Sequence, residues 1–221
     1  MDINKWQNYV ELLRGNPPDK ESLAFFSGLP STSSFINDHA YLRPVPFGSR
    51  FVKKDSMDTL WSQTLNTPDT IKHAVVLIRK DIMSLQYRIK DEEVADYGCK
   101  WVPDVALLVQ LGSKINGFHN TVHGGVLAAV LDECFATAVE TVRCCLSGPK
   151  GKYLTTINPL YTANLSLNYR RPAESPGVLI VEARLQQRQG RKWLLQGRIR
   201  GEDGRVLVDA TSLWIAGTGK I

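Results

Sequence analysis

An almost unbroken apolar stretch dominates the second half of the chain. It reads HGGVLAAVLDE over residues 123–133, so that two glycines open it and acids close it. Every residue from Val126 to Leu131 is apolar, and this part is therefore expected to be buried on all sides. Together with the residues that follow, the spacing predicts one long helix from about Thr121 to Cys144.

Strand-like segments flank this helix on both sides. Val105 to Leu111 is a compact apolar run, and Asn116-Gly117 is expected to form a turn after it. Four further segments follow the helix, at Tyr153–Tyr169, Val178–Gln187, Trp193–Arg200 and Val206–Trp214. Short turn sequences separate these four, so consecutive strands are expected to pair as antiparallel neighbours. One helix against a curved antiparallel sheet predicts an α+β fold.

The first part of the chain shows weaker periodicity. A helix is predicted around Trp6 to Leu13 and another from Asp19 to Phe26, followed by a linker at Ser31–Ser34. Three weaker elements are expected further on: a short strand at Arg50–Lys53, a helix at Met57–Leu65, and a helix or strand at Ile71–Ile78. We therefore divide the chain into an N-terminal extension, residues 1–95, that packs on a main domain, residues 96–221.

Composition narrows the class of protein. The 221 residues are 43% hydrophobic and 22% charged, as in ordinary globular chains. No apolar stretch is long enough to span a bilayer and no secretory signal opens the sequence, so we expect no membrane partner and a cytoplasmic location, with mitochondria or peroxisomes left open. The four cysteines show no metal-ligand spacing and fit a reducing compartment.

The net charge of +5 mildly favours an anionic partner. The basic residues are scattered, and no nucleic-acid-binding motif accompanies them. A phosphorylated carrier such as coenzyme A therefore fits better than a nucleic acid, which is not expected as a partner.

The start of the long helix and Asp132 together suggest chemistry on a carbonyl group. Glycines let a ligand approach the backbone, and a helix N-terminus favours developing negative charge. Asp132, about two turns further along, could act as a base or a nucleophile. It borders the apolar side of the helix, where a carboxylate needs a hydrogen-bond partner. Glu133 and Glu140 share another arc and are expected to face solvent or a second subunit.

These residues resemble the hotdog-fold acyl-CoA thioesterases of the phenylacetate-pathway and thioesterase-superfamily type. The resemblance rests on the His-Gly-Gly at 123–125 with an acid nine residues after the histidine, and on the segment 162–172, which contains Tyr-x-x-Pro. It covers about Val105 to Trp214, and the whole chain resembles fungal proteins of similar length with an N-terminal extension. It implies a hotdog fold, a homodimer or dimer of dimers, and an acyl-CoA or acyl-carrier thioester as substrate, without a cofactor.

The resemblance also implies roles for single residues. Asp132 matches the carboxylate that attacks the thioester or activates water, and Gly124 matches the amide that polarises the carbonyl group. His123 matches a histidine that braces the glycine turn. Thr162 falls where relatives place a residue that positions the attacking water. In this family each site combines the helix acid of one subunit with loop groups of the other.

The remaining assignments concern an asparagine and the substrate contacts. The asparagine that relatives carry six residues before the histidine falls at Gly117, so that an insertion in the loop would be needed to give its role to Asn116. Further residues are expected to bind the substrate, namely Gly125, Asn120, Tyr169, Arg170 and Arg171.

Several alternatives stay open. Asp132 could be a structural acid bonded to a neighbouring turn. His119 and His123 are four residues apart, but no third ligand has matching spacing, so no metal is expected. Thioester hydrolysis is the leading hypothesis. The same fold also serves dehydratases and tailoring enzymes of fungal secondary metabolism, and a non-catalytic acyl- or carrier-binding protein is the third possibility.

Overall fold

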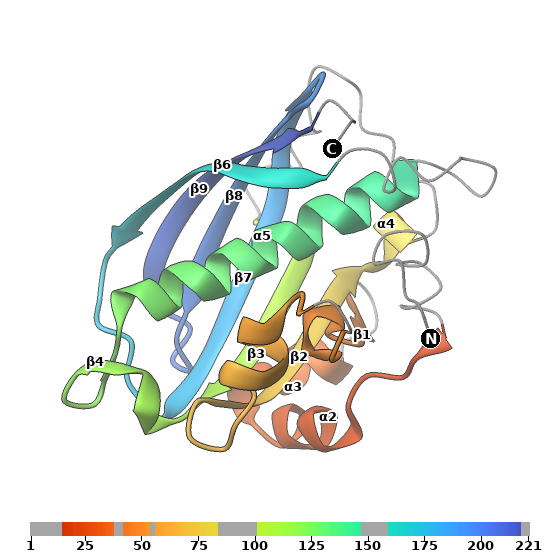
Figure 1. Ribbon diagram of the computed structural model, residues 1–221. Coiled ribbons are helices and arrows are strands. Elements are labelled where there is room, and N and C mark those ends of the chain that lie inside the picture. Colours follow the sequence, from red (N-terminus) through yellow and green to blue (C-terminus); the bar gives the residue numbers. More distant parts are fainter. Residues whose placement is uncertain (1–14, 38–41, 54–55, 84–100, 147–158, 218–221) are drawn as a thin grey trace.

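A long helix lies across one face of a curved antiparallel sheet in the computed structural model (Figure 1). The structure describes residues 15–37, 42–53, 56–83, 101–146 and 159–217. The helix, α5 (Gly124–Leu146), contains 23 residues. The sheet has seven strands in the order β1-β2-β3-β7-β8-β9-β6, and each strand is antiparallel to its neighbours. This confirms the expected α+β hotdog arrangement.

The sheet strands agree closely with the sequence-based expectation in the second half of the chain. Their bounds are β1 (Leu42–Val45), β2 (Ile71–Arg79), β3 (Val105–Leu111), β6 (Leu160–Tyr169), β7 (Gly177–Gln189), β8 (Lys192–Arg200) and β9 (Val206–Ala216). The predicted start of β6 at Tyr153 lies outside the described residues. The pairing expected from chain order is confirmed for β7, β8 and β9 but wrong for β6, which pairs with β9 at the sheet edge rather than with β7.

The segment before α5 differs from the prediction. Asn116 and Gly117 do not form a turn. They belong to a small hairpin of β4 (Asn116–Phe118) and β5 (Thr121–Val122), which follows η3 (Ser113–Ile115). The turn itself lies at residues 119–120, where Asn120 has a left-handed φ of 50°. The long helix therefore starts at Gly124 rather than Thr121.

The core lies between α5 and the sheet. Val130, Leu131 and Phe135 are completely buried in this cluster. Gly197 of β8 lets the helix approach closely, since a Cβ there would lie 2.6 Å from Cζ of Phe135. The expected exposure of Glu140 is wrong: the side chain is buried and forms a paired hydrogen bond with Arg143, three residues further along, at 2.7 and 2.8 Å. A buried carboxylate is stable there because its charge is matched within the same turn.

The other face of the sheet carries the first helices of the described chain. α2 (Lys20–Ser27) begins, as predicted, at Asp19, whose side chain accepts from the Ser22 amide at 2.8 Å. The predicted linker is wrong, because α3 (Pro30–Asn37) is a helix with proline in its first turn. Both helices join a second apolar cluster with Val75 and Leu77, which alternate with the core residues of β2. The helix predicted near Trp6 lies outside the described residues.

The segment between β1 and β2 packs beside α5. It contains η1 (Gly48–Arg50) and the π-helix η2 (Leu60–Thr64), the latter inside the predicted helix. The short strand expected at Arg50–Lys53 is wrong, because Arg50 ends η1 and residues 51–53 are irregular. The Ser49 hydroxyl donates to Glu133 of α5, and Trp61 joins the main core. A short α4 (Lys80–Met83) follows β2.

Two strands from before residue 95, β1 and β2, thus extend the same sheet as the main domain, and the domain boundary stays a prediction. In the described part of the chain, no helix has the length and apolar character needed to cross a bilayer.

Candidate active site

Asp132 and Thr162 meet at the edge of the sheet. Asp132 projects half-buried from α5, and the Thr162 hydroxyl on β6 donates to its Oδ1 at 2.9 Å. Burial raises the pKa of Asp132, because the charged form loses solvation, and the hydrogen bond from Thr162 opposes that rise. The pair leaves the second carboxylate oxygen available for a reacting group.

A β-bulge in β6 gives Thr162 its direction. Thr162 lies opposite Trp214 of β9, and Asn164 lies opposite the adjacent Leu213. Ala163 therefore has no partner on β9 and is the extra residue of the bulge. Leu165 packs toward the main core. Strict alternation back from Leu165 would point Ala163 toward α5 and Thr162 away from it. The extra residue shifts the alternation by one, so that Thr162 points toward α5. Bulges near functional sites commonly redirect a side chain in this way.

His123 holds the start of α5. Its Nδ1 accepts from the Gly125 amide at 2.9 Å, and its own amide donates to the Ile115 carbonyl at 2.9 Å. The Val126 amide donates to the His123 carbonyl at 2.9 Å. Among the described residues, the Gly124 N–H has no hydrogen-bond partner. One amide of the first turn is therefore left for a ligand.

Tyr169, at the end of β6, reaches the same turn. Its hydroxyl donates to the Gly124 carbonyl at 3.0 Å. A Cβ added to Gly124 would lie 3.4 Å from Cζ and Oη of Tyr169, so the ring packs directly beside this glycine. The strand that carries Thr162 thus also contacts the helix start.

The two candidate asparagines lie on the hairpin that leads into α5. The Asn116 side-chain Oδ1 is buried, and within the described ranges it has no hydrogen-bond partner. Asn120 is exposed in the turn, and its carbonyl accepts from the Ser175 amide at 3.1 Å. A Cβ at Gly117 would lie 3.1 Å from the backbone of His123, which fixes the hairpin close to the helix start.

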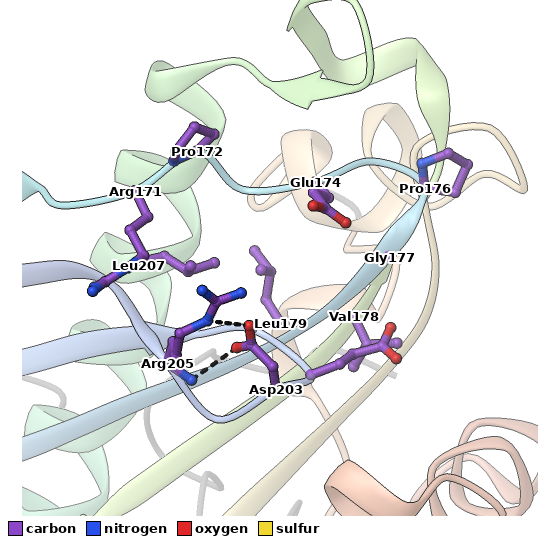
Figure 2. A pocket seen from close by; sticks show the side chains of 12 residues that line it. Arg171, Pro172, Glu174, Pro176, Gly177, Val178, Leu179, Asp203, Arg205 and Leu207 are labelled. Atoms are coloured by element: carbon purple, nitrogen blue, oxygen red, sulfur yellow. Dashed lines mark hydrogen bonds and ion pairs between the residues drawn. The ribbon is translucent and has the colours of Figure 1, made fainter.

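The two candidate arginines lie beyond Tyr169. Arg170 is exposed and pairs with Asp209 at 2.8 Å. Arg171 donates to the Val206 carbonyl at 3.0 Å and lines a cavity of about 470 Å³ between the segment after β6 and the turn before β9 (Figure 2). Figure 2 shows the Arg205 side chain turned toward Asp203, with which it forms an ion pair.

The charge of this cavity does not favour a polyphosphate. Its lining includes two arginines and three acids, so its formal charge is −1. One of the arginines, Arg205, is already paired with Asp203. A nucleotide with several phosphates would be repelled rather than attracted by this lining.

Gly124 and Asp132 lie too far apart within one chain to contact the same carbonyl group. Gly124 and Asp132 lie eight residues apart on the same helix. At about 1.5 Å per residue their backbones are separated by about 12 Å. A single carbonyl group cannot contact both, since each partner must lie within about 3 Å of its atoms. Within the described ranges, no three His, Cys, Asp or Glu side chains gather as metal ligands.

Comparison with known families identifies the region that carries these residues. A family model of the thioesterase superfamily matches residues 119–208. This segment of the chain is therefore similar to the thioesterase superfamily. The matched segment includes α5, β6, β7 and β8, and therefore contains Asp132, Thr162 and Tyr169.

Individual relatives match over different lengths. Verlamelin biosynthesis protein B of Lecanicillium sp is 28% identical over 183 residues, which cover 75% of this chain and 75% of that protein. Acyl-coenzyme A thioesterase THEM4 of Mus musculus is 32% identical over 109 residues, 49% of this chain and 41% of THEM4. The chain therefore matches less than half the length of that thioesterase.

Solved structures, some of them of thioesterase superfamily proteins, are also similar. The PaaI protein of the phenylacetic acid degradation operon of E. coli is 14% identical to this chain. The match covers 53% of this chain and 75% of PaaI, with a TM-score of 0.43.

Sequence reasoning named Asp132, Thr162 and His123 as candidates, but it did not predict three structural features at or beside them. These are the bulge at Ala163, the contact of Tyr169 with the Gly124 carbonyl, and the contact of Ser49 with Glu133. Each depends on pairing between distant segments, for which the sequence carries no local signal.

Proposed function

We propose that this protein hydrolyses acyl thioesters carried on coenzyme A or on a phosphopantetheine arm, with Asp132 as the reacting carboxylate. The match of residues 119–208 to the thioesterase superfamily supports thioester hydrolysis in general. The observation that carries the assignment to Asp132 is its 2.9 Å hydrogen bond from Thr162 in a half-buried position. A carboxylate held and partly desolvated in this way is typical of a functional group.

Two mechanisms are compatible with this geometry. In the first, Asp132 attacks the thioester carbon, the C–S bond breaks, the thiolate leaves, and water then hydrolyses the resulting anhydride. In the second, Asp132 takes a proton from a water molecule as that water attacks the same carbon. In both, the Gly124 N–H would stabilise the negative charge that develops on the carbonyl oxygen.

The proposal requires two copies of the chain, as a homodimer or dimer of dimers. Asp132 of one copy would face Gly124 of the other, since the two residues are too far apart within one helix. β6 supports this arrangement, because it lies at the edge of the sheet with most of its side chains exposed. An unpaired strand edge is a ready site for pairing with a second chain.

Two other functions use the same scaffold. A dehydratase would remove water from a 3-hydroxyacyl thioester without releasing a thiol. A non-catalytic binding protein would hold an acyl thioester without changing it. The name of the Lecanicillium relative, a verlamelin biosynthesis protein, keeps a tailoring reaction among the alternatives. We favour hydrolysis because the histidine nearest the site, His123, already accepts from the Gly125 amide.

The test is a panel of acyl-CoA and acyl-carrier thioesters with detection of free thiol and of dehydrated product. We expect thiol release by the wild-type protein and its loss in Asp132→Asn. Water loss without thiol would establish a dehydratase. Tight acyl-CoA binding with neither product would establish a binding protein. An Asp132→Asn variant as active as the wild type would show that another group reacts.

A further inference from the structure

We propose that Tyr169 is a positioning residue that orients the Gly124 amide toward the substrate. This inference rests on the proposed function, because it concerns the amide that would polarise the thioester carbonyl. It differs from the expectation that Tyr169 contacts the substrate itself. The structure offers the hydroxyl a different partner, the Gly124 carbonyl.

The peptide unit between Gly124 and Gly125 is held at both of its polar groups. Its carbonyl oxygen accepts from the Tyr169 hydroxyl at 3.0 Å. Its N–H donates to Nδ1 of His123 at 2.9 Å. Because a peptide unit is planar and rigid, two hydrogen bonds at opposite ends fix its rotation. We call this arrangement of Tyr169, the peptide unit and His123 the peptide clamp.

The peptide clamp lies at two glycines, where the backbone is conformationally flexible. Gly124 and Gly125 have no Cβ, so their dihedral angles are the least restricted in the helix. The absence of a Cβ also permits the clamp, since a Cβ on Gly125 would lie 3.1 Å from Nδ1 of His123. The glycines thus leave room for the rings of His123 and Tyr169. The hydrogen bonds of these two side chains in turn restrict the dihedral angles that the glycines leave free.

The clamp also decides which amide is available. The Gly125 amide donates to the His123 ring and the Val126 amide to the His123 carbonyl. The preceding amide, that of Gly124, has no partner within the described part of the chain. A fixed peptide after Gly124 limits the directions that this remaining N–H can take. Such preorganisation of a donor is the usual basis of oxyanion stabilisation.

The hydroxyl of Tyr169 has one proton, and the Gly124 carbonyl accepts it. The phenol therefore has no donor left for a thioester oxygen. Tyr169 and Thr162 share β6, so one strand supports Asp132 and the Gly124 amide together. In a two-copy site these two groups would serve different catalytic centres.

The first test compares Tyr169→Phe with Tyr161→Phe. The first variant keeps the ring beside Gly124 and removes only the hydroxyl. The second removes a hydroxyl from a tyrosine of the same strand that is 52% exposed and, by alternation, on the opposite face from Thr162. We expect Tyr169→Phe to lower kcat about 10- to 100-fold for every thioester, with KM changed by less than about twofold. Tyr161→Phe should match the wild type.

A substrate-contact role would give the opposite result. Loss of the hydroxyl would then raise KM, to an extent that differs between substrates, and leave kcat largely unchanged. That outcome would overturn the proposal, as would wild-type kinetics in Tyr169→Phe.

A second measurement separates this proposal from the proposed function. The probe is an acyl-CoA analogue in which a methylene replaces the sulfur and the carbonyl carbon is isotopically labelled. We expect the infrared carbonyl band to move to lower frequency on binding to the wild type and back toward its value in water in Tyr169→Phe. No shift in the wild type would contradict the role of Gly124. An equal shift in both proteins would contradict only the role of Tyr169.

Discussion

The hydroxyl of Thr162 donates a 2.9 Å hydrogen bond to the carboxylate of Asp132, thirty residues earlier in the chain. One residue comes from the central helix and the other from the edge strand, so the pair exists only when helix and sheet are correctly packed. The carboxylate is partly desolvated and still solvent-accessible. Substitutions of Asp132 and Thr162 therefore test the proposed function directly.

The first prediction concerns Asp132→Asn. If Asp132 is the reacting carboxylate, as proposed, the change should lower kcat by about a thousandfold or more, because neither direct attack nor water activation survives. The variant keeps the size of the side chain and an acceptor for the Thr162 hydroxyl. Steady-state thiol release over the thioester panel measures the effect.

The same variant should not lose stability. Burial raises the pKa of Asp132 in the folded state above its unfolded value. The folded protein therefore binds this proton more tightly than the unfolded chain does. Ionisation lowers the stability as pH rises from the unfolded-state pKa to the folded-state pKa, and the full penalty applies above both. Asp132→Asn should unfold at an equal or higher temperature than the wild type at pH 7, and the difference should disappear in acid. A much lower unfolding temperature at pH 7 would make Asp132 a structural acid.

The second prediction concerns Thr162→Val, with Thr162→Ser as the matched control. The hydrogen bond from Thr162 lowers the pKa of Asp132, so its loss in the valine variant should raise that pKa further. The proposed mechanism requires the ionised carboxylate, and it therefore predicts that the acidic limb of the kcat/KM profile moves to higher pH in Thr162→Val. Thr162→Ser keeps a hydroxyl and should resemble the wild type. A limb that moves to lower pH would exclude Asp132 as the titrating group.

The third prediction concerns His123 as the residue that holds the start of α5. Replacing it with alanine removes the acceptor of the Gly125 amide and should cost about 1 kcal/mol, as with other helix N-caps. His123→Asn retains an acceptor at a similar distance from the backbone and should recover most of that loss. Urea unfolding of the three proteins measures the difference. Equal destabilisation by asparagine and alanine would show that the ring stabilises the turn by packing instead.

Much of the fold could be predicted from the sequence where periodicity is strong. α5 and the last three strands follow uninterrupted or alternating apolar patterns, and their predicted bounds differ from those observed by at most three residues. The helix at Pro30–Asn37 could not be predicted, because it contains four consecutive serine and threonine residues. These usually favour turns, but here the buried Thr32 hydroxyl donates to the Phe26 carbonyl at 2.6 Å and joins α3 to α2.

The site could be predicted only in part. Asp132 and His123 lie within one continuous motif, which local spacing reveals. The position of β6 beside β9 depends on a connection that crosses the sheet, and no pattern within β6 specifies it. Nor does alternation reveal that Ala163 is an extra residue, because a bulge is defined only relative to its partner strand.

The last prediction tests that bulge with two single-residue deletions in β6. Deleting Ala163 removes the unpaired residue, so simple alternation from Leu165 leaves Thr162 facing α5. Deleting Ser166, which is paired with Thr211, keeps the bulge and turns both Thr162 and Leu165 to the opposite face.

The Ala163 deletion should therefore fold with stability near that of the wild type and retain the proposed thioesterase activity. The Ser166 deletion should lose about 2 kcal/mol or more, because apolar side chains leave the core, and its activity should fall with the loss of the Thr162–Asp132 contact. Thermal unfolding and thiol release measure both effects. If the Ser166 deletion were the better tolerated of the two, the bulge would not be what directs Thr162 toward Asp132.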